Sequence, residues 1–333
     1  MSLLSNWREV IATANLSGDK QMDPISKWLI ITRASVFSMT ATSGFIGGLL
    51  AAAQVEDPNW GHFGLALLGL VLAHAANNMI NDFFDLEGGV DTDEYARAQY
   101  APHPILNGMI SKRGLLLAIV TVTLVDAFIM LVFISSLGIP VLSFEMTGLF
   151  ISLFYVAPPI RLKHIGLGEP GVFLVWGPLM IGGTYFVTAG ELPSFGVWLA
   201  SVPYALIVTT VLIGKHIDKI QADRQKGIRT LPVLIGERQA LWLNMFFMAS
   251  YYIIVAWLVI VGTLGIWVLL TFLAIPRLIQ VIRVYRAPRP QEPPPDYPVW
   301  PLWYVSAAFF HNKRAGGLFV VGLVMNLIFP ILL

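Results

Sequence analysis

Residues 61–85 read GHFGLALLGLVLAHAANNMINDFFD, an apolar run that ends in an acidic cluster. The run is long enough to cross a bilayer as a helix, which takes about 20 residues. A carboxylate inside hydrocarbon costs roughly 2.5–3.5 kcal/mol on insertion scales, so an acidic cluster at the membrane edge indicates a function. A second apolar run ends in a second acidic segment, Asp218 to Asp223. Binding of a divalent metal and a phosphate group would account for both segments.

The composition indicates an integral membrane protein. Of 333 residues, 56% are hydrophobic and only 12% are charged, and the mean hydropathy is +0.71. We predict an all-α, polytopic membrane protein with about nine transmembrane helices in a bundle. The predicted spans lie near residues 28–54, 61–82, 114–135, 140–158, 171–189, 196–217, 240–261, 264–285 and 316–333. The absence of cysteine excludes disulfides and thiol chemistry, and nothing indicates nucleic-acid binding.

The distribution of Lys and Arg sets the predicted orientation. Alternate turns of the predicted bundle contain no Lys or Arg, and the basic residues fall on the other side, which is typical of the cytoplasmic face. We therefore expect the N-terminus and both acidic segments to be cytoplasmic. Residues 1–27 are too polar and too long to begin a cleaved signal, so they form a predicted cytoplasmic segment before the membrane domain at 28–333. Within that domain, residues 286–299 form a predicted Pro-rich cytoplasmic linker, with an interfacial aromatic segment expected before the last helix.

A polar stripe runs along the helix predicted at 61–82. Because residues three and four apart share one face of a helix, the stripe should face a cavity; its members are His74, Asn77, Asn78, Asn81 and Asp85. Gly88 and Gly89 would end the helix and let Asp91 fold back toward Asp85. Magnesium binds one or two carboxylates together with phosphate oxygens, so Asp85, Asp82, Asp91 and Asp93 are candidate ligands. A helix cap with a solvated turn would explain Asp91 and Asp93, but not the asparagines.

The second acidic segment combines acids with bases. Its carboxylates could hold a metal while its cations bind free phosphate oxygens, as expected where a diphosphate leaves. The candidates are Asp218, Lys219, Asp223, Arg224, Lys226 and Arg229. An ordinary basic cytoplasmic loop is the alternative interpretation, and for this segment alone it would be preferred.

Taken in order, these motifs resemble a known family. The first is Asn81-Asp82-x-x-Asp85-x5-Asp91, and the second is Tyr155-x-x-Pro158-Pro159-x-Arg161-Leu162-Lys163-x-x-Gly166-Leu167-Gly168-Glu169. Gly177-Pro178-Leu179 and Asp223-Arg224-x-x-Gly227-x-Arg229-Thr230-Leu231-Pro232 follow. The chain resembles the UbiA superfamily of intramembrane prenyltransferases from about Trp28 onward. Within it, the motifs are most similar to the branch that prenylates 1,4-dihydroxy-2-naphthoate in menaquinone synthesis.

The resemblance implies nine helices around a cavity open to lipid, with two aspartate-rich motifs that bind a prenyl diphosphate through Mg²⁺. By matching position, Asn81, Asp85 and Asp91 belong to the first motif and Asp223 to the second. Arg161, Lys163 and Arg229 would contact the diphosphate or support the loops above it, and Tyr155 would lie near the ionising carbon. The implied reaction is electrophilic substitution on an aromatic acceptor. His74, Asn77 and Asn78 could orient that acceptor.

Two departures from the family pattern fall at the site. Four residues before Asp223 the family has an aspartate, but this chain has Lys219. Asp218 is one place away and would point about 100° from that position on a helix. Either a distorted helix lets Asp218 serve, or the Lys219 ammonium replaces the charge of one metal ion. In addition, this chain has His103-Pro104-Ile105 where many relatives have Arg-Pro-Leu.

Two other functions stay open. A UbiA-like enzyme could cyclise a terpene or prenylate a non-aromatic acceptor, and an ion-coupled transporter would also need polar groups inside the membrane. Pyrophosphate release would separate the enzymes from the transporter. Dependence of that release on an acceptor would separate the two kinds of enzyme.

Overall fold

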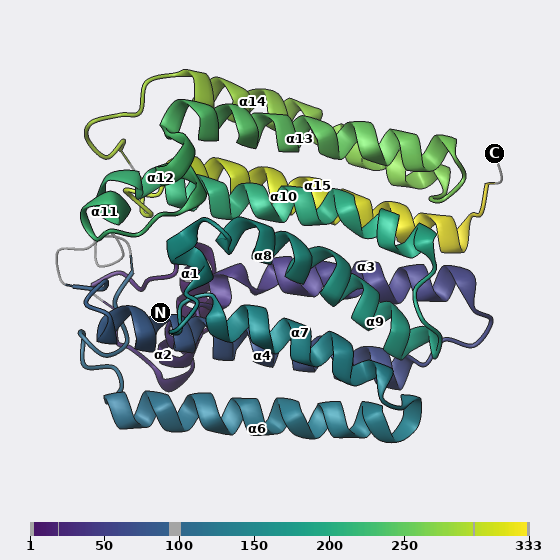
Figure 1. Cartoon of the computed structure of the whole chain (residues 1–333). Coiled ribbons are helices and arrows are strands. Elements are labelled where there is room, and N and C mark those ends of the chain that lie inside the picture. Colours follow the sequence, from purple (N-terminus) through teal and green to yellow (C-terminus); the bar gives the residue numbers. More distant parts are fainter. Residues whose placement is uncertain (1–2, 19, 93–100, 296, 332–333) are drawn as a thin grey trace.

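The computed structural model describes residues 3–18, 20–92, 101–295 and 297–331, and within these ranges the regular elements are helices with no strand. Figure 1 shows long helices lying roughly side by side in a bundle, with the short helices gathered at one end. Asp93 lies outside the described residues.

Seven single helices form most of the bundle: α3 (Phe37–Gln54), α4 (Trp60–Glu87), α6 (Lys112–Leu137), α7 (Pro140–Phe154), α10 (Phe195–Asp218), α13 (Glu237–Ile260) and α15 (Tyr304–Ile328). Two further helical paths are composite. One joins α8 (Gly168–Leu174), a π-helical turn η3 (Val175–Leu179) and α9 (Met180–Ala189), and the other joins the 3₁₀ segment η4 (Ile266–Ala274) to α14 (Ile275–Arg286). The short elements are α1 (Leu3–Thr13), α2 (Pro24–Ile31), η1 (Ala34–Val36), η2 (Leu162–Ile165), α11 (Ile220–Gln225) and α12 (Leu231–Ile235).

Each of the nine predicted spans overlaps a helical path, and the all-α membrane fold is confirmed. Among the described residues, seven helical stretches are long and apolar enough to cross a membrane, and α7 is shorter. The number of crossings therefore stays a prediction. The last helix was placed wrongly, because α15 begins at Tyr304 rather than near residue 316. Its first turns carry His311, Asn312, Lys313 and Arg314, which a search for apolar runs passes over.

Small residues let helices approach closely around η3. A Cβ on Gly47 of α3 would lie 2.4 Å from the carbonyl oxygen of Ile181, and a Cβ on Gly177 would lie 2.5 Å from Cβ of Ala205. The Ser43 hydroxyl donates to the Trp176 carbonyl oxygen at 2.6 Å. Close backbone approach through glycine is a common basis of helix packing in membranes. The contacts fix η3 and α9 between α3 and α10.

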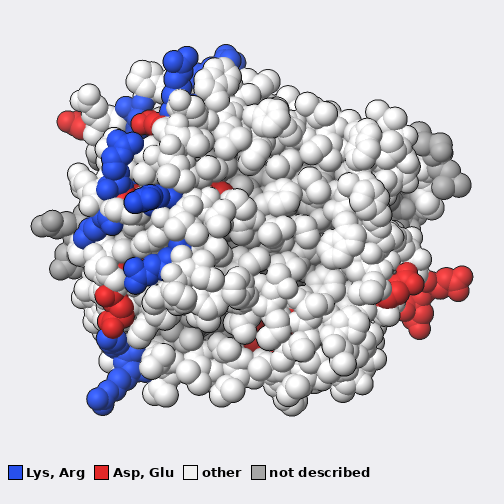
Figure 2. All heavy atoms as spheres, viewed as in Figure 1, with Lys and Arg blue, Asp and Glu red and all other residues white. Residues whose placement is uncertain are grey.

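Charge divides the molecule into two ends. Figure 2 shows Lys and Arg side chains gathered at the end that carries α11 and α12, a largely uncharged middle, and acidic side chains at the opposite end. The end with Lys and Arg is called the basic end below. This separation is the pattern expected of a protein that crosses a bilayer.

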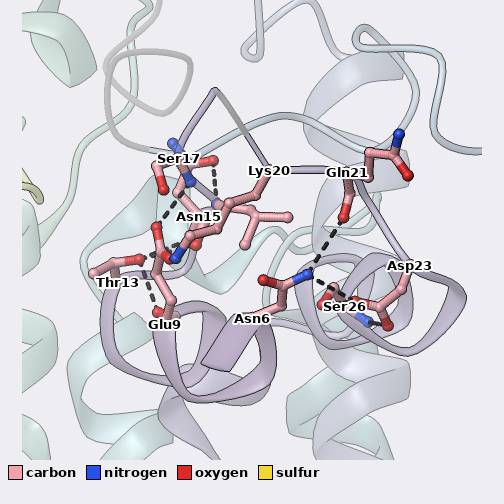
Figure 3. A network of polar contacts seen from close by, with 10 residues as sticks. Asn6, Glu9, Thr13, Asn15, Ser17, Lys20, Gln21, Asp23 and Ser26 are labelled. Carbon is pink, nitrogen blue, oxygen red and sulfur yellow. Dashed lines mark hydrogen bonds and ion pairs between the residues drawn. The ribbon is translucent and has the colours of Figure 1, made fainter. Parts of the chain in front are cut away.

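The N-terminal segment folds onto the basic end. Asp23 caps α2 by accepting from the backbone N–H groups of Ile25 and Ser26, each at 3.0 Å, and the Trp7 indole N–H of α1 donates to the same carboxylate at 3.0 Å. Figure 3 shows Asp23 with Ser26 and Asn6, together with the Glu9–Lys20 ion pair. Residues 12–14, at the end of α1, line the internal cavity. The predicted segment 1–27 therefore contributes to the same cavity as the membrane domain.

Candidate active site

The described helices enclose a cavity of about 570 Å³ with mostly apolar walls. α4, α6, α7, η3, α9 and α10 contribute to these walls, together with α15. Polar and charged residues enter the lining at the basic end, where Arg33, Asn81, Tyr155 and Lys215 lie. The cavity can hold an apolar chain. Asn81 lies one turn before Asp85 on α4, and Lys215 lies one turn before Lys219 at the end of α10, so the charged end of the cavity is next to both acidic segments.

The first acidic segment folds back on the end of α4, as its sequence predicted. The Asp85 carbonyl oxygen accepts from the N–H groups of Val90 and Asp91, at 2.8 and 3.0 Å. Gly89 makes this reversal possible, because its φ of +67° lies in the left-handed region that glycine adopts without a steric penalty. Asp85 and Asp91 are therefore both buried at the same point.

His103, which the sequence marked as a departure from the family pattern without giving it a role, lies beside Asp91. Its Nδ1 accepts from the backbone N–H groups of Ile105 and Leu106, at 3.2 and 3.3 Å. The proton of a neutral ring must then be on Nε2, which faces Asp91 Oδ2 at 3.4 Å. Burial alone would raise the pKa of Asp91, but His103 and nearby cations outweigh burial and lower that pKa. Asp82, Asp91 and His103 offer ligand atoms within 4.8 Å of one another, but a protonated Nε2 cannot coordinate a metal.

Asp82 is fully buried and forms an ion pair with Arg33, from the turn between α2 and η1. Arg33 also lines the cavity, so this pair joins the acidic segment to the cavity wall. Sequence analysis missed Arg33. A signal was present, because a lone Arg inside an apolar segment predicted to span the membrane is costly unless it has a partner or a function.

The second acidic segment meets the first through two buried lysines. Lys219 Nζ lies 3.5 Å from Asp223 Oδ1, and Lys163 Nζ donates to Asp85 Oδ2 at 2.8 Å. Burial opposes the charge on Lys163, but attraction to Asp85, Asp223 and Asp91 outweighs burial and raises its pKa. Burial lowers the pKa of Lys219, although Asp223 favours the charged form. The two segments thus form one mixed cluster of carboxylates and ammonium groups.

Hydrogen bonds and one hydrophobic contact hold together the loops that follow α4 and α11. The Lys226 ammonium donates to the Gly89 carbonyl oxygen at 2.9 Å, and Val90 packs in one small buried cluster with Ile228. The Arg229 N–H donates to the His164 carbonyl oxygen at 3.3 Å, which ties in the loop after α7. Among the predicted diphosphate ligands, Lys163 and Lys219 are buried, whereas Arg161, Arg224, Lys226 and Arg229 are exposed at the basic end.

Asp218 has a different position from the one expected of a second-motif ligand. Its Oδ1 and Oδ2 accept from the N–H groups of Tyr304 and Val305, each at 3.0 Å, and Arg289 lies 3.9 Å from Oδ1. Asp218 therefore caps the start of α15. Of the two alternatives for the missing aspartate, this geometry favours replacement by the Lys219 ammonium, because both oxygens of Asp218 already accept from backbone donors.

Four members of the polar stripe on α4 line the cavity, as predicted, whereas Asp85 is not among its lining residues. His74 Nδ1 lies 2.7 Å from the Thr40 hydroxyl, and its ring packs between Phe37 and Trp176. The remaining stripe residues and their neighbours complete the lining. Asn77 accepts from the Ser152 hydroxyl of α7 at 2.9 Å, Asn78 donates to the Thr32 carbonyl oxygen at 2.9 Å, and Asn81 and Tyr155 line the wall beside them.

Lys215 and the pair Glu169–His216 were also missed. His216 Nδ1 lies 2.7 Å from Glu169 Oε1, and both side chains are almost fully buried between α8 and α10. Lys215, the next residue along α10, lines the cavity one turn before Lys219. The pair therefore fixes the part of α10 that carries both lysines.

Comparison with known proteins places this arrangement in a family. The model of the UbiA prenyltransferase family matches residues 40–313. "UbiA prenyltransferase domain-containing protein 1" of Dictyostelium discoideum is 25% identical over 260 residues, which cover 74% of this chain and 77% of that protein. The 1,4-dihydroxy-2-naphthoate octaprenyltransferase of Bacillus subtilis is 27% identical, with 62% of this chain and 65% of that protein covered. Digeranylgeranylglyceryl phosphate synthase of Natronomonas pharaonis is 28% identical, with 66% and 69% covered.

A solved structure has the same fold. A UbiA homolog from Archaeoglobus fulgidus, bound to GPP and Mg²⁺, aligns with a TM-score of 0.59 and 16% identity over 88% of this chain and 99% of that one. The match of the family model to most of the chain agrees with the motifs that carried the resemblance. The chain belongs to the UbiA prenyltransferase family, whose members are enzymes that transfer prenyl groups.

Proposed function

We propose that this enzyme transfers a polyprenyl group from a prenyl diphosphate to an aromatic acceptor in the membrane, with 1,4-dihydroxy-2-naphthoate as the first acceptor to test. One observation carries the proposal. Two acidic segments bring the buried pairs Lys163–Asp85 and Lys219–Asp223 together at the charged end of an apolar cavity. The cluster suits a diphosphate, and the cavity suits a hydrocarbon tail.

The residues at this end fit a magnesium ion. Asn81, Asp85 and Asp91 of the first motif and Asp223 of the second offer the oxygen ligands that Mg²⁺ prefers. Asp91 Oδ2 is buried and has the long contact of 3.4 Å with His103 Nε2, which leaves a lone pair for a cation. When bound, Mg²⁺ would neutralise charge on the departing diphosphate. The Archaeoglobus homolog bound to GPP and Mg²⁺ supports this assignment by likeness of fold.

Lys163 and Lys219 bind the diphosphate oxygens, and the exposed Arg161, Arg224, Lys226 and Arg229 attract the anion to the basic end. The C1–O bond of the donor breaks, and its electron pair leaves with the diphosphate. The acceptor ring attacks C1 to form a C–C bond and then loses a proton. The apolar walls exclude water, which would otherwise capture the allylic cation as an alcohol.

The acceptor lies against the α4 stripe. His74, Asn77 and Asn78 supply polar atoms there, and the neighbouring rings of Phe37 and Trp176 give a surface on which an aromatic ring can pack. Tyr155 lines the wall between this stripe and Lys163, beside the carbon that ionises.

We further propose that the basic end faces the cytoplasm and that the side of the cavity opens to lipid, from which both apolar substrates enter. The segregation of Lys and Arg at that end supports the orientation. Residues 1–27 and the linker 286–299 then lie on the cytoplasmic side.

A non-aromatic acceptor is the second candidate, because one relative is named for digeranylgeranylglyceryl phosphate synthesis. The test is an acceptor panel with purified enzyme in lipid vesicles: 1,4-dihydroxy-2-naphthoate, 4-hydroxybenzoate, a prenylated glyceryl phosphate, or none. Mass spectrometry identifies the product. A prenylated ring confirms the proposal, and product from the glyceryl phosphate alone replaces it with the second candidate. Release of pyrophosphate without any acceptor would indicate cyclisation or hydrolysis. If no pyrophosphate is released with any acceptor or without one, an ion-coupled transporter becomes a candidate function again.

A further inference from the structure

Two carboxylic acids lie inside the membrane-spanning part of the cavity, and the reaction described above uses neither. Asp126 is near the middle of α6 and Glu145 is near the start of α7, and both half-buried side chains line the cavity. The wall around them is otherwise apolar, with Ile129, Phe133, Val141, Phe144, Phe186 and Val187. Figure 2 shows acidic atoms recessed in the otherwise uncharged middle of the molecule. Ionisable groups at such depth are costly and usually functional.

The two carboxyl groups lie at the same level of the bundle. Asp126 Oδ1 is 3.1 Å from the position that a Cβ on Gly69 of α4 would occupy. Glu145 is placed by register, because Ser152 contacts Asn77 and α7 runs in the same direction as α4. Seven residues back along α7 is about 10 Å, and the eight residues from Asn77 to Gly69 are about 12 Å. Both acids therefore stand beside Gly69.

Neither acid has a partner in the described part of the chain. None of the hydrogen bonds or ion pairs among those residues involves Asp126 or Glu145. A carboxyl group needs hydrogen-bond partners in either protonation state, so water must reach these groups when the cavity holds no tail at their level. A hydrocarbon tail that passed between them would remove that water and offer nothing in return.

The distance between the charged end of the cavity and the two acids can be compared with the length of a prenyl tail. Gly69 lies sixteen residues before Asp85 on one continuous helix, which is about 24 Å. Three bonds of an extended chain span about 3.5 Å, so the four chain bonds of one isoprene unit span about 4.7 Å. About five units cover the distance, less the length of the diphosphate itself. A geranylgeranyl tail of four units spans about 19 Å, so with the diphosphate in the remaining 5 Å or so it ends at the level of the acids. An octaprenyl tail that extends along the cavity must pass them.

We infer that Asp126 and Glu145 form a polar stop that limits the length of the prenyl tail, so that the enzyme prefers geranylgeranyl diphosphate to octaprenyl diphosphate. This inference rests on the proposed function. It assigns a specificity role to two residues remote from the diphosphate site, and it predicts that making them apolar opens the cavity to longer donors.

The experiment compares farnesyl, geranylgeranyl and octaprenyl diphosphates, with the acceptor found by the panel above. For the Asp126→Leu/Glu145→Leu enzyme, kcat/KM for octaprenyl relative to geranylgeranyl diphosphate should rise at least about tenfold over wild type, because leaving one buried polar group unsatisfied costs about that factor. The Asp126→Asn/Glu145→Gln enzyme is the matched control. Its amides also need partners, so it should keep the wild-type preference.

A second variant shortens the cavity instead. Gly148 lines it one turn from Glu145 toward the charged end, and an added Cβ would meet nothing within 4 Å. Gly148→Leu should shift the preference from geranylgeranyl toward farnesyl diphosphate, and it carries the test if the double Leu variant does not fold.

An unchanged donor profile in the variants that fold would overturn the inference. So would a change in acceptor KM with no change in donor preference, which would make the acids part of an acceptor site. A wild-type enzyme inactive with every donor would instead contradict the proposed function.

Discussion

Lys219 stands where the family pattern has an aspartate, and the effect of its charge can be tested directly. Its ammonium lies 3.5 Å from Asp223, where a second carboxylate would otherwise help to hold a metal ion. If that charge replaces one ion, pyrophosphate release should rise with the first power of free Mg²⁺ in wild type. Lys219→Asp should steepen the dependence toward the second power. Equal second-order dependence in wild type and Lys219→Ala would exclude the replacement.

Asp218 and Asp85 are buried carboxylates at or near the ends of two helices, yet they should respond differently to substitution. Asp218 accepts two backbone N–H groups at the start of α15, and loss of such a cap costs about 0.5–2 kcal/mol of stability. Asp218→Ala should therefore lower the thermal midpoint while each folded molecule keeps activity within about twofold of wild type. Asp85→Asn should lose at least about 100-fold in pyrophosphate release, comparable to loss of one preorganised charge-stabilising group. A similar loss of activity in both variants would indicate that Asp218 acts in the reaction and does not only cap α15.

Residue spacing predicted contacts within a segment but not between segments. The return of Asp91 to Asp85 followed from Gly88 and Gly89, and Lys219 and Asp223 are one helical turn apart. The partners of Arg33 and Asp218 are 49 and 86 residues away, at Asp82 and Tyr304, so no local pattern could reveal them.

Gly214 lets α10 lie close to the first turn of α15. A Cβ on Gly214 would lie 3.0 Å from both N and Cα of Val305. A larger residue at position 214 would therefore strain the contact or push the two helices apart. Gly214→Ala should cost about 1–3 kcal/mol, as overpacking does in a tight interface. Gly317→Ala on α15 is the control, because its Cβ would meet nothing within 4 Å. Thermal unfolding in detergent measures both, and equal midpoints would contradict this view of the interface.

Apolar runs predicted the long helices well, because burial in lipid demands length and composition alone. They failed where tertiary contacts decide an end. α15 begins twelve residues early because Asp218 caps it, and the first predicted span is divided at Arg33, whose φ of 54° interrupts the helix. The π-helical turn at Val175–Leu179 was not predicted either, since it depends on packing against α3 and α10.

The cavity belongs to the whole bundle, and for that reason the sequence predicted only one of its walls. The stripe on α4 indicated a polar face, but the facing positions on α6 and α7, including Asp126 and Glu145, come from segments with no shared pattern. Relatives at about 25–28% identity carry three different names.

Prenyl transfer itself is the central claim, and one reconstitution tests it. Purified enzyme in lipid vesicles receives Mg²⁺, geranylgeranyl diphosphate and 1,4-dihydroxy-2-naphthoate, and pyrophosphate and prenylated product are measured together. The account predicts equal amounts of both, loss of both on chelation of Mg²⁺, and loss of both in Asp85→Asn but not in Asp218→Ala. Pyrophosphate without prenylated product, or full activity of Asp85→Asn, would contradict it.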